Sequence, residues 1–425
     1  MKYENSLAFA QNADKNDPLR KWRSEFHIPI INGKEAYYFT GNSLGCQPKR
    51  TRSFVEDEMK KWEEYGVEGH FVPKDKPWMH YHKVTKNALA NIVGAKPIEV
   101  VAMNNLSVNL HLLMVSFYRP TKSRYKVICE AGAFPSDQYM FETQLKHHGL
   151  EPANALIEIQ PREGEYTLRT EDIIKTIHET GDELALILIG GLQYYTGQLF
   201  EMDKITAAGH EVGAKVGFDL AHGIGNIPLY LHDWNVDFAT WCSYKYLNSG
   251  PGNVSGIFVH ERHANDSSIN RFAGWWGHDE DERFLMQKGF KPMPGADGWQ
   301  LSNGNILANA AHAASLEIFE EVGMEALREK SLKLTGYLEF IMDELNEANG
   351  SFEIITPREP KHRGAQLSIF FHHRGKELFD HLVENGVIGD WREPNVIRIA
   401  PVPLYNSFED VYQFGRLLKE ALSKH

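Results

Sequence analysis

The sequence has few cysteines, no long apolar run and no concentrated basic segment. Its three cysteines, Cys46, Cys129 and Cys242, match neither a disulfide framework nor a zinc site. No segment reaches the roughly 18 consecutive apolar residues of a membrane span, and the start, MKYENSLAFAQNADKNDPLRKW, lacks the apolar core of a signal peptide. We therefore expect a cytoplasmic protein that is neither secreted nor embedded in a membrane.

The charge balance excludes another class of partner. The formal net charge is -12, and no Lys/Arg run supplies the positive field that nucleic acids or anionic membranes require. Of the 425 residues, 42% are hydrophobic and 24% are charged, which is typical of a globular protein with a sizeable core. This length predicts two domains and the charge favours a small-molecule substrate.

The middle of the chain alternates helical and strand patterns. Short runs rich in Val, Ile and Phe are separated by amphipathic segments such as TEDIIKTIHE and MDKITAAGHEVG. The strand-like runs are KVICEAG, LALILIGG, KVGFDLA, FATWCSY and GIFVHE. Continuously apolar strands are buried on both faces, so the pattern predicts an α/β fold with a mostly parallel sheet covered by helices. SVNLHLLMVSFY predicts a helix with Ser107 as its N-cap.

The last third has a smaller-scale pattern. Residues 306–322 (ILANAAHAASLEIFEEV) predict a strong helix, and a second long amphipathic helix follows. Strand and helix patterns then alternate in QLSIFFH, KELFDHLVENG, NVIRIAP and FEDVYQFGRLLKEAL. We predict an N-terminal arm over 1–50, a large domain over 51–304 and a small α+β domain over 305–425.

Lys245 stands in WCSYKYLN, where its surroundings are apolar. A buried ammonium is costly, so such a lysine usually loses its proton or serves chemistry. Asp219 ends the strand in KVGFDLA, and His222 follows three residues later. In a parallel sheet the carboxyl ends of the strands face the ligand crevice. A strand-end carboxylate, a lysine and the helix start at Ser107 together form the set that a pyridoxal phosphate enzyme needs.

Each member of this set has a physical task. The lysine forms the Schiff base and moves protons, the aspartate keeps the pyridine nitrogen protonated, and backbone N–H groups bind the phosphate. Taken singly, a strand-end Asp is often a helix cap, and a lysine among aromatics often reaches solvent. Phe134 in EAGAFPSD could stack on the cofactor ring, and Asp137 could fix the adjacent loop.

A set of longer motifs makes the identification specific. The motifs are YYFTGNSLGCQPK, NNLSVNLHLLM, EAGAFPSDQY, QYYTGQLF, VGFDLAHGIGNIPLYLHDWNVDFATWCSYKYLN, GWWGH, LSNGN and IRIAPVPLYNSFEDVYQF. Together, from Tyr37 to Phe414, the chain resembles the kynureninase family. The resemblance implies a fold-type I pyridoxal phosphate enzyme, a homodimer with active sites at the subunit interface. It also implies hydrolysis of kynurenine or 3-hydroxykynurenine to anthranilate or 3-hydroxyanthranilate plus L-alanine, in tryptophan catabolism or NAD biosynthesis.

The resemblance also implies roles for individual residues. Lys245 would carry the cofactor and act as acid and base, with Tyr244 bonding the phosphate and sharing in proton transfer. The remaining cofactor contacts would be Leu106 and Ser107 at the phosphate, Phe134 on the ring, Asp219 at its nitrogen, and Asp137, His222 and Tyr195 around them. Ser107 stands where the family often has Thr, and the hydroxyl is kept. Trp275 and Asn303 would come from the partner subunit.

The same resemblance implies which residues bind the substrate. Arg398 would bind the α-carboxylate as a bidentate fork, a geometry that Lys lacks. Ser43, His70, Tyr195 and Asn303 would line the pocket for the rest of the substrate. His70 with Asn303 is the pairing that goes with the 3-hydroxylated substrate in the family, because a site built to bond a ring hydroxyl is left unpaired without it. By itself, VEGHFVP would indicate a solvated loop histidine.

Two other enzyme classes are alternatives. A related aminotransferase or a cysteine desulfurase shares the Asp-to-Lys spacing, but a desulfurase needs a mobile nucleophilic cysteine after the lysine and none follows Cys242. A metal-dependent hydrolase is suggested by 20 histidines, including HYH at 80–82 and HH at 147–148 and 372–373. None of these has the second ligand pair of a familiar metal motif, so we expect no metal. A purely binding role would be recognised by the absence of a cofactor chromophore.

Overall fold

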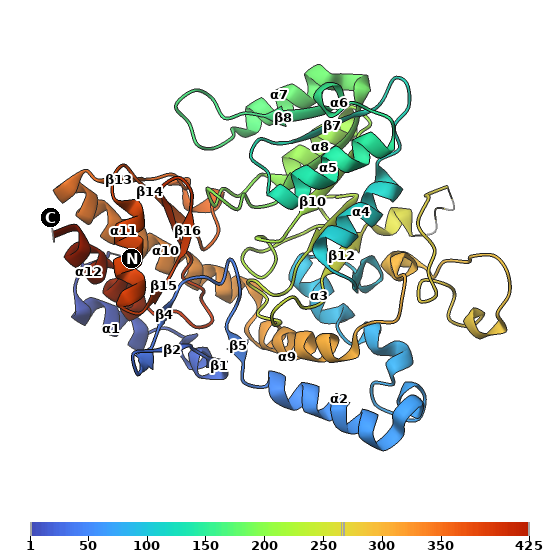
Figure 1. Ribbon diagram of the computed structural model, residues 1–425, viewed down its shortest axis with the longest axis horizontal. Helices are drawn as coiled ribbons and strands as arrows, with labels where there is room; N and C mark the ends of the chain where they lie inside the picture. The colour runs from blue at the N-terminus through green and yellow to red at the C-terminus, as the bar shows by residue number, and fades with distance from the viewer. Residues whose placement is uncertain (1, 265, 267, 424–425) are drawn as a thin grey trace.

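A seven-stranded sheet forms the centre of the larger part of the molecule (Figure 1). The computed structural model describes residues 2–264, 266 and 268–423. The strand order is β6-β12-β11-β10-β9-β7-β8. In this order the strands are β6 (Val100–Ala102), β12 (Gly256–Val259), β11 (Phe238–Trp241), β10 (Lys215–Asp219), β9 (Leu184–Gly190), β7 (Lys126–Glu130) and β8 (Leu156–Ile159). The pairs that β12 makes with β6 and β11 are antiparallel and the other pairs are parallel, which confirms the mostly parallel sheet.

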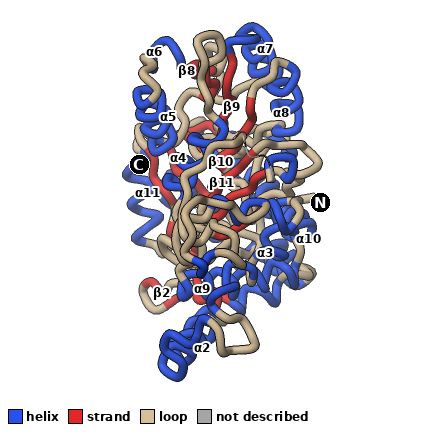
Figure 2. The backbone as a smooth tube through the Cα atoms, turned by 90° about the vertical axis from the view of Figure 1, so that its right-hand side faces the viewer, coloured by secondary structure: helices blue, strands red, loops and turns tan. Residues whose placement is uncertain are grey.

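Helices cover both faces of this sheet, and β9 shows why. Its side chains alternate, so Leu186 and Leu188 pack in one apolar cluster and Ile187 and Ile189 in another. Figure 2 shows α4 and α5 on one side of the strands and α3, α7 and α8 on the other. These helices are α3 (Lys86–Val93), α4 (Leu106–Phe117), α5 (Pro135–His147), α7 (Thr170–Thr180) and α8 (Met202–Glu211), with the short α6 (Pro152–Ala155) beside β8.

A four-stranded antiparallel sheet organises the smaller part. Its order is β13-β14-β17-β16. The strands are β13 (Phe352–Ile354), β14 (Leu367–Phe371), β17 (Val396–Ile399) and β16 (Asp390–Arg392). The helices that share its apolar cluster are α1 (Leu7–Lys15), α10 (Met324–Asn349), α11 (Gly375–Glu384) and α12 (Phe408–Ser423). Because α1 packs on α12, the two ends of the chain lie in the same part of the molecule (Figure 1).

The N-terminal segment ties the two parts together. Phe39 is fully buried in the cluster of the smaller sheet, and β4 (Tyr37–Tyr38) pairs in parallel with β15 (Val387–Ile388). Further along, β5 (Gln47–Pro48) pairs with β1 (Phe26–His27), and β2 (Ile30–Ile31) pairs with β3 (Lys34–Glu35). The segment then continues into α2 (Thr51–Tyr65), which packs on α9 (Ile306–Val322).

The predicted helices and strands are largely confirmed, but the predicted N-cap of α4 was wrong. The helix over 306–322 has the predicted limits. The helix predicted to be capped by Ser107 begins earlier, at Leu106 with Asn105 as N-cap, because Asn105 is the residue with extended backbone (φ -121°, ψ 160°). Within the described ranges, no helix combines the length and apolar character needed to cross a bilayer.

The division of the chain after residue 304 stays a prediction. Leu316, Ile318 and Phe319 of α9 are buried in the apolar cluster of the seven-stranded sheet. This packing favours a division closer to the start of α10.

Candidate functional site

A cavity of about 230 Å³ lies at the carboxyl ends of β7, β9 and β10. Its walls are the first turn of α4, the start of α5 and the loop after β11. The lining residues are Asn105, Leu106, Ser107, Glu130, Phe134, Ser136, Asp137, Gly190, Leu192, Tyr194, Asp219, Ala221, His222, Tyr244, Lys245 and Ser255. The structure thus brings eight residues from the predicted set onto one surface. These are Leu106, Ser107, Phe134, Asp137, Asp219, His222, Tyr244 and Lys245.

Close backbone packing sets the position of Lys245. The loop leaves β11 and turns through Asn248, whose φ is +54°. The Lys245 carbonyl accepts a hydrogen bond from the Asn248 N–H at 2.9 Å. Gly45 of the N-terminal segment lies so near that an added Cβ would be 2.4 Å from the Lys245 carbonyl oxygen. Only glycine fits this approach, so the N-terminal segment and the lysine loop are held in one arrangement.

Two buried carboxyl groups line the same cavity as the lysine. Asp219 ends β10 and accepts a hydrogen bond from the Ala221 N–H at 2.7 Å. Burial raises its pKa, against the lowering effect of that N–H and of the Lys245 ammonium. The pKa of Asp137 is raised well above its ordinary value, first by burial and then by the charges of Asp219 and Glu130. A cationic ligand nitrogen beside Asp219 would relieve this cost, because an opposite charge favours the ionised carboxylate.

The start of α4 can bind an anion. The Asn105 side chain makes no capping hydrogen bond to the helix, so it leaves the N–H groups of the first turn to a ligand. Leu106 and Ser107 of this turn line the cavity. The helix has 12 residues, and the partial positive charge at its N-terminus favours a phosphate.

An aromatic surface and a neutral histidine complete the walls. The Lys245 Nζ atom lies 5.7 Å from the centroid of the Phe134 ring, and Tyr194 meets this ring edge to face at 5.2 Å. The pKa of His222 is lowered well below its ordinary value, first by burial and then by the charge of Lys245. Its Nδ1 atom is buried and has no hydrogen-bond partner. A neutral imidazole with a free ring nitrogen can bond or stack on a bound aromatic ligand.

These features fit pyridoxal phosphate. The helix start can bind the phosphate, Asp219 can pair with a protonated ring nitrogen, and Lys245 can bind the aldehyde carbon. A bound cationic ring would favour the ionised form of Asp219, whose pKa is raised by burial, and its substituents could bond the unpartnered His222 nitrogen. Tyr244 also lines the cavity, and burial raises its pKa, so its hydroxyl is a donor at neutral pH.

Sequence reasoning missed Glu130. It ends β7 in the quoted motif EAGAFPSD, and its position at a strand end was the signal that could have found it. Its carboxylate accepts a hydrogen bond from the Gly190 N–H at 3.2 Å. Burial raises its pKa to about 7. Tyr194 and Ser136, which also stand in quoted motifs, were missed as well.

Six other predicted site residues do not line this cavity. They are Ser43, His70, Tyr195, Trp275, Asn303 and Arg398. Ser43, Trp275 and Asn303 are exposed, and His70 is half-buried with its Nδ1 3.0 Å from the Val67 carbonyl. Tyr195 donates a hydrogen bond to the Glu393 carbonyl at 3.2 Å. Arg398 is buried behind Tyr194, whose carbonyl it bonds at 2.7 Å.

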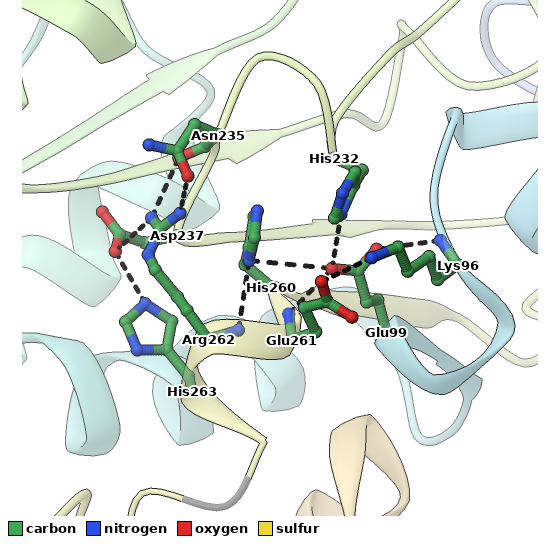
Figure 3. A network of polar contacts seen from close by, with 9 residues as sticks. All are labelled: Lys96, Glu99, His232, Asn235, Asp237, His260, Glu261, Arg262 and His263. Carbon is green, nitrogen blue, oxygen red and sulfur yellow. Dashed lines mark hydrogen bonds and ion pairs between the residues drawn. The ribbon is translucent and has the colours of Figure 1, made fainter.

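One histidine group has the spacing of a metal site (Figure 3). In the described ranges, Glu99, His232 and His260 offer ligand atoms within 4.8 Å of one another. These atoms are already hydrogen bonded, because Glu99 Oε1 accepts from the Glu261 N–H at 2.7 Å and lies 2.9 Å from His232 Nδ1. His260 Nδ1 accepts from the Arg262 N–H, and the two imidazole rings are nearly parallel at 19°. Because the candidate ligand atoms already have protein hydrogen-bond partners, we assign this group a structural role.

Known proteins resemble the whole chain. A kynureninase of Flavobacterium psychrophilum is 59% identical over 423 residues, which cover 99% of each chain. A kynureninase of Nematostella vectensis is 48% identical and covers 98% of this chain and 94% of its own. The family described as "Kynureninase C-terminal domain" matches residues 327–418.

Solved structures support the fold. A cysteine desulfurase from Thermococcus onnurineus has a TM-score of 0.77 at 18% identity and covers 98% of each chain. A variant of the protein C-DES, with glycine covalently linked to its PLP cofactor, has a TM-score of 0.74 at 15% identity and covers 90% of this chain and 96% of its own. At these identities the likeness shows the fold-type I architecture alone.

Proposed function

The chain belongs to the kynureninase family, and from this premise we propose that it hydrolyses kynurenine and 3-hydroxykynurenine, with preference for the hydroxylated substrate. It is a pyridoxal phosphate-dependent hydrolase that cleaves a carbon–carbon bond. The proposed products are anthranilate or 3-hydroxyanthranilate and L-alanine. The observation that carries the proposal is the meeting of Lys245, Asp219 and the start of α4 on one cavity.

Each residue of the cavity has a separate role in the proposed reaction. The bound cofactor supplies an electron sink for the carbanions that the bond cleavage requires. Lys245 removes the proton at the substrate α-carbon and later returns it, and Asp219 keeps the ring nitrogen charged. Tyr244 would donate a hydrogen bond to the phosphate and take part in the proton transfer at the γ-carbonyl. Phe134 orients the ring, and Asp137 and His222 support it from the sides.

Arg398 is the proposed ligand of the substrate α-carboxylate. Its guanidinium is buried and belongs to a group in which Asp390 is paired with both Arg392 and Arg398. Two cations and one anion leave a positive excess, and this excess favours a second carboxylate. The buried Nε atom of Arg398 has no hydrogen-bond partner among the described residues, so it is a donor that a carboxylate could satisfy.

His70 and Asn303 are the proposed origin of the preference for the 3-hydroxyl group. Ser43 and Tyr195 would complete this end of the pocket. Polar groups arranged for a hydroxyl are left unpaired by a substrate without it, which costs binding in the transition state. His70, Trp275 and Asn303 lie away from the cavity of their own chain, which supports a homodimer in which Trp275 and Asn303 serve the partner's site.

The remaining proposals concern the cellular location, the pathway and the partners of the enzyme. We place the enzyme in the cytoplasm, in tryptophan catabolism or NAD biosynthesis, with no nucleic-acid or membrane partner.

A desulfurase activity is disfavoured because all three cysteines are buried. Burial raises the pKa of Cys46 to about 12 and also raises the pKa of Cys129 and Cys242, so none offers a reactive thiolate.

The test is a kinetic comparison of the two substrates on the cofactor-loaded protein, with L-alanine as the measured product. We expect alanine release from both and a kcat/KM at least about 10-fold higher for 3-hydroxykynurenine, the value of one well-placed hydrogen bond. Equal kcat/KM values would remove the preference and keep the hydrolysis. No alanine from either substrate would remove the proposed function itself.

A further inference from the structure

Asp390 and Arg398 face each other across two neighbouring strands. The antiparallel register of β16 and β17 places Asp390 directly opposite Arg398. Directly opposite residues point to the same face of a sheet, so an acid and a base at these positions meet. The Arg398 Nη2 atom lies 2.5 Å from Asp390 Oδ2, and the side chains are 1% and 10% exposed.

The guanidinium is held at two points. Besides Asp390, the Tyr194 carbonyl accepts a hydrogen bond from Arg398 Nη1 at 2.7 Å. Asp390 is itself fixed by Arg392, whose Nη2 donates a hydrogen bond to Oδ2 at 3.2 Å. The Arg398 Nε atom is buried without a partner. An arginine side chain has many rotamers, and two bonds to fixed acceptors leave it one orientation with a donor unsatisfied.

This assembly lies next to the cofactor cavity. Tyr194 lines the cavity and contacts the Phe134 ring edge to face. His222 lines it as well, and Arg398 and Arg392 contribute to the lowered pKa of His222 after burial and Lys245. The positive charges of Arg392 and Arg398 therefore act on a residue of the cavity wall.

We propose that Asp390 is a positioning residue for substrate binding, which orients the Arg398 guanidinium so that its free donor meets the substrate α-carboxylate. The inference rests on the proposed function, in which Arg398 binds that carboxylate. Asp390 does not touch the substrate. A buried ion pair that served only the stability of the small sheet would have no effect that depends on the substrate's carboxylate.

The test uses Asp390→Asn in the full-length, cofactor-loaded enzyme. We expect the KM for kynurenine to rise about 10- to 100-fold, the value of a hydrogen bond between charged groups, with kcat changed less than about threefold. Binding of L-alanine, followed by the cofactor absorbance, should weaken by a similar factor. Binding of kynuramine, the amine that lacks the α-carboxylate, should stay within about twofold of wild type.

The control is Asp343→Asn. Asp343 pairs with Arg358 at 2.8 Å in the same part of the molecule, but its side chain is 48% exposed. This variant should keep the wild-type KM. Should Asp390→Asn not fold, Asp390→Glu keeps the charge and displaces the carboxylate by one methylene, and should raise the KM several-fold with the same dependence on the carboxylate.

An unchanged or lowered KM in either Asp390 variant overturns the inference, as does equal weakening of L-alanine and kynuramine binding. Failure of the proposed function has a different signature, because the wild-type protein itself would then release no alanine from kynurenine.

Discussion

The amine of Lys245 stands over the ring of Phe134, with 5.7 Å between Nζ and the ring centroid. The two residues belong to segments more than a hundred positions apart, the start of α5 and the loop after β11. The space between them is where an aromatic cofactor bound to the lysine would stack. The proton-transfer role of Lys245 and the stacking role of Phe134 can each be tested by a separate substitution.

Lys245→Ala should lose turnover while the protein still folds. We expect a fall of about 100- to 10,000-fold, because the residue moves protons at the substrate α-carbon. Borohydride treatment followed by protein mass spectrometry should show no added cofactor mass in the variant, and an added mass in wild type. Lys175→Ala, which removes an amine whose side chain is 70% exposed on α7, is the control and should behave as wild type. Retained turnover in Lys245→Ala would contradict the assignment.

Phe134→Leu should weaken cofactor binding without abolishing it. Replacing the aromatic ring by an aliphatic side chain loses the stacking contribution, so we expect an increase in Kd of about 2- to 10-fold. Titration of cofactor-free protein with pyridoxal phosphate, followed by tryptophan fluorescence, gives the Kd. Tyr139→Leu alters an exposed aromatic on α5, the helix that Phe134 caps, and should leave the Kd unchanged. An unaltered Kd for Phe134→Leu would show that the ring is not a stacking surface.

Glu130→Gln should change how stability depends on pH. Burial raises the pKa of Glu130 to about 7, so the folded protein holds this proton more tightly than the unfolded chain does. The resulting stabilisation is complete below about pH 4.5 and is lost as the pH rises through about 7. Between about pH 5 and pH 8, cofactor-free wild type should therefore lose up to about 3 kcal/mol relative to Glu130→Gln, whose amide can still accept from Gly190.

Urea unfolding at the two pH values measures this difference. Glu179→Gln, at an exposed position of α7, is the control and should show the wild-type pH dependence. Parallel pH profiles for wild type and Glu130→Gln would mean that Glu130 is ionised in the folded protein throughout this range.

Two impaired variants should recover activity toward 3-hydroxykynurenine when they are mixed. If Asn303 serves the partner's site, a heterodimer of Lys245→Ala and Asn303→Ala contains one site with both changes and one with neither. Random exchange of subunits should then recover about a quarter of the wild-type activity, because half of the dimers are mixed and half of their sites are intact. The measurement is turnover after mixing, unfolding and refolding the two variants together. No recovery, with exchange shown by mass-tagged subunits, would place Asn303 in the site of its own chain.

The order of the motifs was enough to predict much of the cavity. Asp219 and His222 follow a continuously apolar strand, and Leu106 and Ser107 open a helix after another. Since the ends of parallel strands meet at one edge of a sheet, local pattern alone predicts that such residues converge. The start of α4 shows the limit of this reasoning, because the backbone conformation that selects Asn105 rather than Ser107 as N-cap is not visible in residue type.

The sequence by itself determined the element types and the strand-end positions of the reactive residues, because hydrophobic period and short-range spacing act locally along the chain. Its longer motifs carried the resemblance that implied the cofactor chemistry. Only the tertiary structure decided that Glu130 is buried beside Gly190, that Gly45 packs against the lysine loop, and that Asp390 pairs with Arg398. These contacts depend on strand register and on packing between distant segments. Their free energy comes from groups that meet only after folding, so no local pattern records them.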